Sequence, residues 1–278
     1  MLCFKNNLPA LFFYSFPFMK KLKLSALLCV TFFCHQGMAQ LNKLKPGFDK
    51  EEFIEMLKIA QKQHIDVDKW SENTAVPDPQ KFTQAYRSNV MAFENMWDRW
   101  LSKDSIAVIS VRGSIMSSVS FLANFYAAMV PATGKLELEK NFTFNYSLSD
   151  KPQAAVHVGF LIATAYLSRD ILPKIDSCYK KGIRSFIITG HSQGGAICYL
   201  LTSYLESLKS KNGLPADIRF KTYCGAGPKP GNLFYAYSYE KLTAGGWAYN
   251  VVNTADWVPE VPFSVQTTDD FTEILIGA

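Results

Sequence analysis

The order of apolar and polar positions along the chain predicts strands and helices that alternate. Four short apolar runs, rich in β-branched or aromatic residues, are typical of buried strands: 105–111, 183–189, 218–223 and 248–253. Apolar residues at helical spacing predict helices over 46–64, 80–101, 160–181, 196–210 and 232–242. Strands that alternate with helices indicate an α/β fold with a mostly parallel sheet. Because the sequence shows neither an internal repeat nor a low-complexity linker, we expect one domain.

Several stretches fit more than one interpretation. Residues 115–130 are largely apolar and suit either a helix or a loop, whereas 136–147 alternate in places and predict one or two strands. Pro173 is expected to bend or break the helix 160–181, since proline lacks the N–H that a helix interior needs. The aromatic stripe on 80–101 would suit lipid contact, but a stripe at this spacing more often packs into a core. A last apolar run at 271–276 predicts one more strand.

The first 39 residues carry the features of a secretory signal. Lys20, Lys21 and Lys23 form a basic start, residues 24–33 form a short apolar run, and the segment ends in Gly37-Met38-Ala39. That run is too short to span a bilayer. We therefore expect translation to start at Met19 and cleavage to follow Ala39. Residues 40–278 would then form the exported domain, either secreted or periplasmic.

The balance of charges gives no support for nucleic-acid binding. The net charge of +5 falls to +1 without the leader, because four of the 29 basic residues and none of the 24 acidic ones lie there. Three cysteines remain in the expected domain: Cys178, Cys198 and Cys224. We interpret them as small core residues, although one disulfide stays open. No cluster of Cys, His, Asp or Glu implies a metal or an organic cofactor.

The sequence Gly190-His191-Ser192-Gln193-Gly194 stands between a predicted strand and a predicted helix. A Gly-x-Ser-x-Gly motif in that context is typical of a nucleophile elbow, a sharp turn that exposes the serine hydroxyl. Glycines on both sides keep the strand and the helix from colliding with the turn. Ser192 is therefore the candidate nucleophile for acyl transfer. The alternative is a Ser-Gly turn that has no part in catalysis.

Two further positions suit acyl transfer at the same edge of the sheet. Asp256 follows the strand 248–253 and comes after Ser192, which is the order of nucleophile and acid in α/β-hydrolases. It would equally suit a turn before Pro259. Ser114 follows the strand 105–111, and its backbone N–H, with or without its hydroxyl, could form an oxyanion hole with the N–H of Gln193.

Five segments together resemble the successive motifs of the class 3, fungal-type lipases, in the family's order: 111–114, 156–160, 190–196, 227–232 and 253–259. The resemblance implies an α/β-hydrolase fold with Ser192 as nucleophile, Asp256 as acid, and Ser114 and Gln193 as the oxyanion hole. It implies a carboxylic ester hydrolase that acts on acylglycerols at a lipid–water interface. It also implies a lid, a short amphipathic helix, within 115–130. A phospholipase A1 or a short-chain carboxylesterase is the alternative, since the sequence does not show the width of the pocket.

The chain departs from the family pattern at two points. Lys229 stands where the family usually has arginine. The larger departure concerns the triad base, because the family's base follows the acid, whereas all four histidines here precede Ser192: His35, His64, His157 and His191. We interpret His64 as a surface residue, His157 as a hydrogen-bonded core residue, and His191 as badly placed to take the Ser192 proton.

Three explanations for the missing base are open. The sequence is a lipase that stops before its base, or a non-catalytic relative that binds lipid or a partner, or a chain in which another group serves as base. We favour the first, because the apolar run 271–276 stands at the end of the sequence without a polar tail.

Overall fold

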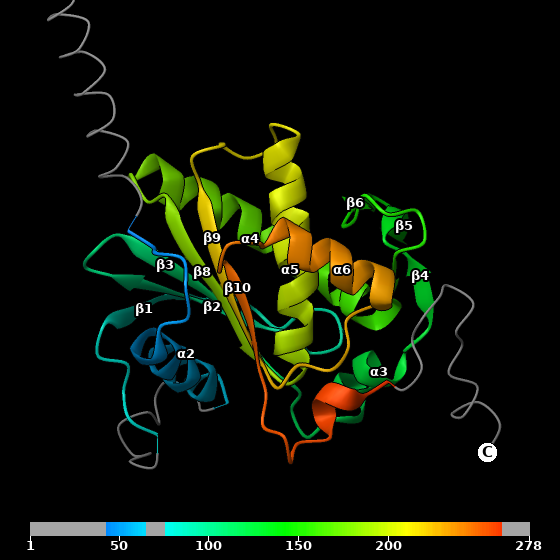
Figure 1. Ribbon diagram of the computed structural model, residues 1–278, viewed down its shortest axis with the longest axis horizontal. Helices are drawn as coiled ribbons and strands as arrows, with labels where there is room; N and C mark the ends of the chain where they lie inside the picture. Colours follow the sequence, from blue (N-terminus) through cyan, green and yellow to red (C-terminus); the bar gives the residue numbers. More distant parts are fainter. Residues whose placement is uncertain (1–42, 65–75, 263–278) are drawn as a thin grey trace, which may run out of the picture. The chain divides into compact units, whose positions relative to one another are not determined.

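The computed structural model describes residues 43–64 and 76–262, and its centre is a six-stranded sheet (Figure 1). The strand order is β1-β2-β3-β8-β9-β10. β3, β8, β9 and β10 are parallel to one another, while β1 and β2 complete one side as antiparallel strands. The bounds are β1 Phe82–Arg87, β2 Trp97–Ser102, β3 Ile106–Val111, β8 Ser185–His191, β9 Arg219–Gly225 and β10 Ala248–Val251. This arrangement confirms the predicted α/β-hydrolase fold class.

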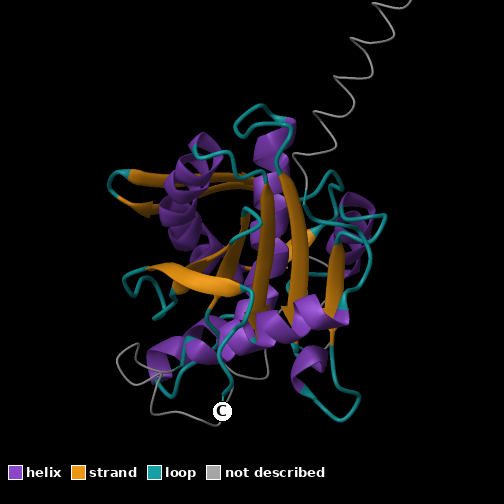
Figure 2. Cartoon of the chain, turned by 90° about the vertical axis from the view of Figure 1, so that its left-hand side faces the viewer, coloured by secondary structure: helices purple, strands orange, loops and turns teal. Residues whose placement is uncertain are grey.

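Helices cover both faces of the sheet, which explains why its strands are apolar without alternation (Figures 1 and 2). In β8, Phe186 and Ile188 enter the core shared with α4 and α5, whereas Ile187 enters the smaller core under α2. The helices are α2 Lys50–Lys62, α4 Val158–Lys180, α5 Gln193–Ser210 and α6 Leu233–Leu242. The predicted helices 46–64, 160–181, 196–210 and 232–242 are therefore confirmed, within a few residues.

The segment between β3 and α4 leaves the central sheet. It forms the short helix α3 (Ser118–Phe125), the strand β4 (Met129–Pro131), which pairs with β7 (Ala155–His157), and a hairpin of β5 (Thr133–Glu139) and β6 (Phe142–Ser147). The stretch 136–147 thus contains two strands. The stretch 115–130 contains a helix that is largely exposed on its outer side, so it is not a buried core helix.

The predicted helix over 80–101 is wrong. The segment forms the antiparallel pair β1 and β2, and the turn between them includes left-handed backbone at Phe93 (φ 56°) and Glu94 (φ 59°). Trp97 and Trp100 are close to one face of a helix, but in a strand they point to opposite faces. Trp97 enters the α4 and α5 core and Trp100 the α2 core. The aromatic spacing fits both structures, and the pairing of β2 with β3 decides between them.

The helix α4 runs unbroken through Pro173, so the proline does not break it. The leader at 1–39 and the expected strand at 271–276 lie outside the described residues. In the part of the chain that the structure describes, no helix is both long enough and apolar enough to cross a bilayer.

Candidate active site

Ser192 occupies a strained turn between β8 and α5. Its backbone angles are φ 56° and ψ −127°, a combination that a residue with a side chain rarely adopts. The Ser192 N–H donates to the carbonyl of Gly225 on β9 at 2.9 Å, which joins the turn to the sheet. A Cβ at Gly190 would overlap the backbone of Gly194, and a Cβ at Gly194 would overlap the carbonyl of Val111. The turn therefore requires both glycines, and the predicted strand–turn–helix context is present.

The half-buried Ser192 stands at the N-terminus of α5. Its side chain makes no capping hydrogen bond to this helix. The first N–H of α5 that bonds back along the helix is that of Ala196, which donates to the Ser192 carbonyl at 3.2 Å. The N–H of Gln193 lies in the first turn and therefore has no acceptor within the helix. The start of a helix carries partial positive charge and favours anions. The Gln193 N–H is thus oriented as a donor for negative charge that develops beside Ser192.

Ser114 lies in the loop after β3, and hydrogen bonds link it to α3 and to the elbow. Its Oγ accepts from Asn124 Nδ2 at 2.9 Å. The Gln193 side chain donates from Nε2 to Asn124 Oδ1 at 3.1 Å and to the Ser120 carbonyl at 2.9 Å. Gly113, just before Ser114, lies so close to the elbow that a Cβ there would be 2.7 Å from the His191 carbonyl. The structure therefore brings the two predicted oxyanion-hole residues into one network.

Asp256 lies in the loop after β10, at the same end of the sheet. The register pairs His191 with Gly225 and Gly225 with Val251, so the ends of β8, β9 and β10 are adjacent. Two strand spacings separate the ends of β8 and β10 by roughly 10 Å. Asp256 is half-buried, and its Oδ1 accepts from the Val258 N–H at 3.0 Å. This hydrogen bond forms a turn before Pro259, the alternative role that the sequence offers for Asp256. A carboxylate has a second oxygen, so this turn does not use up its capacity to accept.

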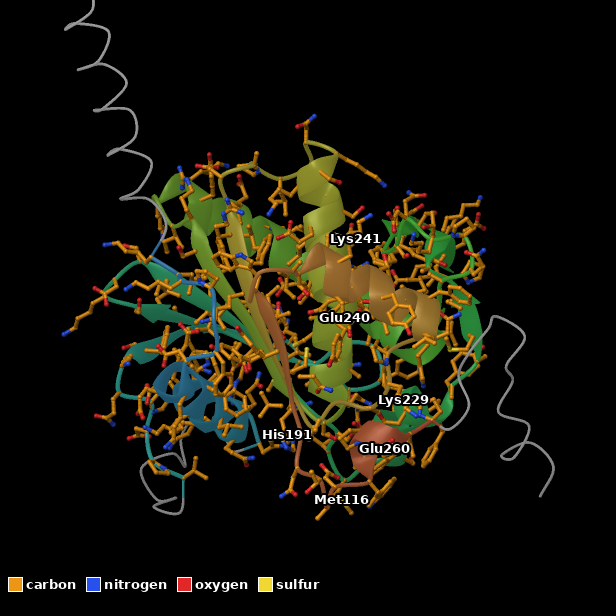
Figure 3. All side chains as sticks on the ribbon, viewed as in Figure 1. Met116, His191, Lys229, Glu240, Lys241 and Glu260 are labelled. Carbon is orange, nitrogen blue, oxygen red and sulfur yellow. The ribbon has the colours of Figure 1, made fainter. Side chains whose placement is uncertain are left out.

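Lys229 lies in the neighbouring loop, and its N–H donates to the Val261 carbonyl at 2.8 Å. This bond joins the loop after β9 to the loop after β10. Figure 3 labels Lys229 and Glu260 beside this junction and His191 at the end of β8. Arg112, at the end of β3, donates to the main-chain carbonyl of Glu94 at 2.6 Å.

His157 is a core residue, as predicted. It is fully buried, its Nε2 hydrogen-bonds the Asn124 carbonyl at 3.1 Å, and its Nδ1 accepts from the Phe160 N–H at 3.4 Å. Since a carbonyl only accepts, the ring must carry its proton on Nε2. Burial lowers the pKa of His157 to about 4, against the small opposing effect of the Asn124 hydrogen bond. The ring is therefore neutral at pH 7 and is not available as a base for Ser192.

His64 is exposed, as predicted, but it lies nearer to the elbow than the sequence indicates. Desolvation, and then the charges of Arg112 and His191, lower the pKa of His64. The neighbouring Gln63 donates from Nε2 to the Ser110 carbonyl at 2.8 Å, and Ser110 pairs with Thr189 of β8, so the end of α2 lies beside β3 and β8 near the elbow. Within the described residues, no histidine is hydrogen-bonded to Ser192 or Asp256.

The three cysteines are free and buried, as the core interpretation expects. Burial raises the pKa of the Cys198 and Cys224 thiols well above the ordinary value, so neither is a reactive thiolate. Cys198 packs directly beneath the elbow, because a Cβ on Gly190 would be 3.0 Å from its sulfur. These residues support the turn by packing.

The family model for lipase (class 3) matches residues 108–266, a segment that contains Ser114, Ser192 and Asp256. The chain belongs to the class 3 lipase family. The secreted mono- and diacylglycerol lipase 1 of Fusarium solani is 28% identical, over 58% of this chain and 48% of its own length. The chain thus spans about half the length of this curated relative.

Solved lipases share the fold of this class 3 lipase-family chain. The Lip2 lipase of Yarrowia lipolytica superposes with a TM-score of 0.57 at 18% identity, covering 81% of this chain and 79% of its own. Lipase II of Rhizopus niveus gives 0.54 at 18% identity, with 76% and 74% covered. At this identity the likeness establishes the fold alone.

Sequence reasoning missed two parts of the site. Asn124 was one unremarkable residue within an apolar stretch, yet its side chain lies between Ser114 and Gln193. The sequence predicts a role only for the backbone N–H of Gln193, whereas its side chain also bonds Asn124 and the Ser120 carbonyl. A polar residue within the apolar stretch 115–130 was the one signal that could have identified Asn124.

Proposed function

We propose that this chain is a serine hydrolase that cleaves carboxylic esters of lipids, with Ser192 as nucleophile. The observation that carries the proposal is the strained backbone of Ser192, held between Gly190 and Gly194 at the start of α5 in a chain of the class 3 lipase family. Strain of this kind persists only where the surroundings impose it, and it is concentrated at functional sites.

The proposed reaction proceeds in two steps through an acyl-enzyme. Ser192 Oγ attacks the ester carbonyl carbon and loses its proton to a general base, and the carbonyl oxygen becomes an oxyanion. The N–H groups of Ser114 and Gln193 donate to that oxyanion. When the intermediate collapses, the ester C–O bond breaks, the alcohol leaves with the proton from the base, and the acyl group stays on Ser192. Water then attacks the acyl carbon, which releases the carboxylic acid and restores the hydroxyl. Asp256 is proposed to orient the base.

The exposed side of α3 and its flanks supports a lipid substrate. Met116 is 95% exposed and Phe125 59%, and Trp257, in the loop that carries Asp256, is 69% exposed. Val119, Leu122 and Tyr126 extend the same apolar surface. Several large apolar side chains exposed on one short helix are typical of a site that contacts a membrane or a lipid droplet. The Fusarium relative, named a mono- and diacylglycerol lipase, makes acylglycerols the first substrates to test, ahead of phospholipids and short-chain esters.

The experiment that tests this proposal measures the role of the nucleophile independently of the role of the base. A fluorophosphonate probe and hydrolysis of p-nitrophenyl butyrate are measured for the wild type and for Ser192→Ala, each with and without added imidazole. We expect labelling and hydrolysis that depend on Ser192 and that rise with imidazole, which can stand in for a base. A residual acceleration of roughly 10³–10⁴-fold over water is the level expected from the oxyanion hole and binding alone. Equal results for both proteins under all conditions would refute the hydrolase.

A second candidate function is a non-catalytic module that binds lipid through α3. It is favoured by the absence, within the described residues, of a histidine that contacts Ser192. In that case adsorption to phosphatidylcholine vesicles persists while Ser192-dependent labelling is absent even with imidazole. His64→Ala tests the third possibility, because loss of imidazole-independent hydrolysis in this variant would identify His64 as the base.

We also propose that the chain is exported and that the mature protein begins at Gln40. The basic and apolar pattern of 19–39 supports this, and the Fusarium relative is named as secreted. Sequencing the N-terminus of the protein from its producing cell tests it. A first residue of Gln40 is expected, whereas retention of residues 19–39 would contradict it.

A further inference from the structure

The inference concerns Met116, and its second half rests on the proposed function. Met116 lies in the loop between β3 and α3, and its side chain is 95% exposed. Figure 3 labels it at the periphery of the molecule. Among the other methionines that the structure describes, Met56, Met96 and Met129 are at most 8% exposed and Met91 is half-buried. Within the described residues, Met116 is therefore the methionine whose thioether is open to solvent.

The local backbone holds this side chain outward. The N–H of Ser117 donates to the Ile115 carbonyl at 2.8 Å, which closes a three-residue turn with Met116 at its centre. The N–H of Ile115 donates to Oγ of the buried Ser120 at 3.1 Å. Ser117 then caps α3, because its Oγ accepts from the Val119 N–H. The turn is thus fixed on both sides, and its central side chain projects into solvent.

The cysteines that the structure describes are poor competitors for an oxidant. Cys178, Cys198 and Cys224 are free thiols in the core, and burial raises the pKa of each. A thiol reacts as its thiolate, and both burial and a raised pKa disfavour that form. A thioether needs no deprotonation, because its sulfur already carries the lone pair that reacts. Exposure therefore decides which sulfur an oxidant reaches first, and Met116 is the exposed one.

We propose that Met116 is a site of oxidation by hydroperoxides, and that its oxidation weakens the contact of α3 with lipid. In the reaction the sulfur lone pair attacks the terminal oxygen of R–O–O–H. An S–O bond forms and the O–O bond breaks. The proton of the transferred oxygen passes to the departing oxygen, which leaves as the alcohol R–OH or, for hydrogen peroxide, as water. Sulfur gives up two electrons, the peroxide gains two, and the product is methionine sulfoxide.

The sulfoxide would change the surface on which it stands. Met116 precedes α3, whose outward side chains Val119, Leu122 and Phe125 are between 47% and 59% exposed. Oxidation converts the apolar thioether into a polar group that accepts hydrogen bonds from water. Transferring this side chain out of water would then no longer stabilise adsorption. Because the exposed side chain has little packing to lose, we expect weaker adsorption without loss of folding stability.

The first measurement is the order in which the methionines are oxidised. The full chain is treated with hydrogen peroxide, samples are quenched over time, and peptide mass spectrometry follows the gain of one oxygen atom at each methionine. We expect Met116 to react about 10-fold faster, or more, than Met56, Met96 and Met129, since susceptibility follows exposure. Unfolding the chain in urea should remove that difference. Equal rates in the folded chain, or a buried methionine that reacts first, would overturn the proposal.

The second measurement is adsorption to phosphatidylcholine vesicles before and after peroxide. For the wild type we expect oxidation to weaken adsorption about 10-fold, the lower end of what moving one methionine side chain out of water contributes. Met116→Leu keeps an apolar side chain that forms no sulfoxide, so its adsorption should not change. Met91→Leu is the matched control and should lose as much as the wild type. Met116→Gln, which is polar from the start, should adsorb as weakly as the oxidised wild type with an unchanged melting temperature.

Reversal separates oxidation of methionine from other damage. Methionine sulfoxide reductases, with dithiothreitol as the reductant, should restore adsorption of the oxidised wild type. An equal loss in Met116→Leu and the wild type would overturn the proposed role of Met116. A wild type that does not adsorb even before oxidation would refute the lipid contact of the proposed function, and the second half of this proposal with it. The order of oxidation would still decide the first half.

Discussion

Lowering the pH from 7 to 4.5 is expected to destabilise the wild type more than the variant His157→Gln. His157 is fully buried and its pKa lies at about 4, against 6.5 for the free side chain. Between these two values the unfolded chain binds a proton at this residue and the folded chain does not. Stability from the neutral ring is therefore complete above pH 6.5 and is lost as the pH falls toward 4.

The size of the effect follows from the difference between the two pKa values. Each pKa unit corresponds to about 1.4 kcal/mol, and the full difference would be reached only below pH 4. From pH 7 to 4.5 the linkage amounts to roughly 2 kcal/mol. Protonation would place an N–H on Nδ1, opposite the Phe160 N–H that this atom now accepts. The start of α4 would loosen first, because the Phe160 N–H loses its acceptor, whereas Nε2–H still donates to the Asn124 carbonyl.

The assay is urea unfolding of both proteins at half-unit steps of pH. Glutamine can keep a donor toward the Asn124 carbonyl, and it does not titrate. Carboxylates that also lose stabilisation in acid, such as Asp49 and Glu55, whose pKa values are lowered, contribute equally to both proteins and cancel in the difference. His64→Gln is the matched control at an exposed histidine. Equal pH dependence of the free energy of unfolding in the wild type and His157→Gln would refute the reasoning.

Three further predictions concern the elbow, the core and the surface. Gly194→Ala should destabilise the protein by about 3 kcal/mol or prevent folding, because the new methyl group meets the Val111 carbonyl; thermal unfolding measures this. Lys221→Met should cost about 3 kcal/mol in urea unfolding, since the buried Lys221 pairs with Glu52 at 2.6 Å and this carboxylate would lose its ion-pair partner and keep only the hydrogen bond from Tyr223 among its contacts here. Phe125→Ser should weaken adsorption to phosphatidylcholine vesicles several-fold without lowering the melting temperature, because this ring is 59% exposed.

Each of these predictions has a control elsewhere in the chain. Gly213→Ala meets no backbone atom closer than 3.3 Å and should change stability little. Lys135→Ala breaks an exposed pair with Glu137, worth less than about 1 kcal/mol. Tyr237→Ser removes a ring that is also 59% exposed, but on α6, and should leave vesicle adsorption unchanged. A loss that is as large in a control as in its partner would contradict the corresponding explanation.

Elements whose signals are local could be predicted from the amino-acid sequence alone. The run 183–189 is apolar because both of its faces are covered, and the glycines around Ser192 are required by backbone contacts within a few residues. The strand–turn–helix context and the order of the motifs therefore followed from neighbouring residues. The hairpin 136–147 was equally readable, since its strands pair with each other.

The tertiary structure decided whatever depends on partners distant in sequence. Aromatic spacing alone gave a helix at 80–101, whereas the segment is a hairpin of β1 and β2 whose second strand also pairs with β3. The end of α2 is held beside β3 by the hydrogen bond from Gln63 Nε2 to the Ser110 carbonyl, which joins residues 47 positions apart. Asn124 and Gln193 meet because α3 lies against the elbow, and hydrogen bonds between such residues leave no periodic trace in the sequence. The sequence thus determined that Ser192 stands on an elbow, and the fold decided which side chains surround it.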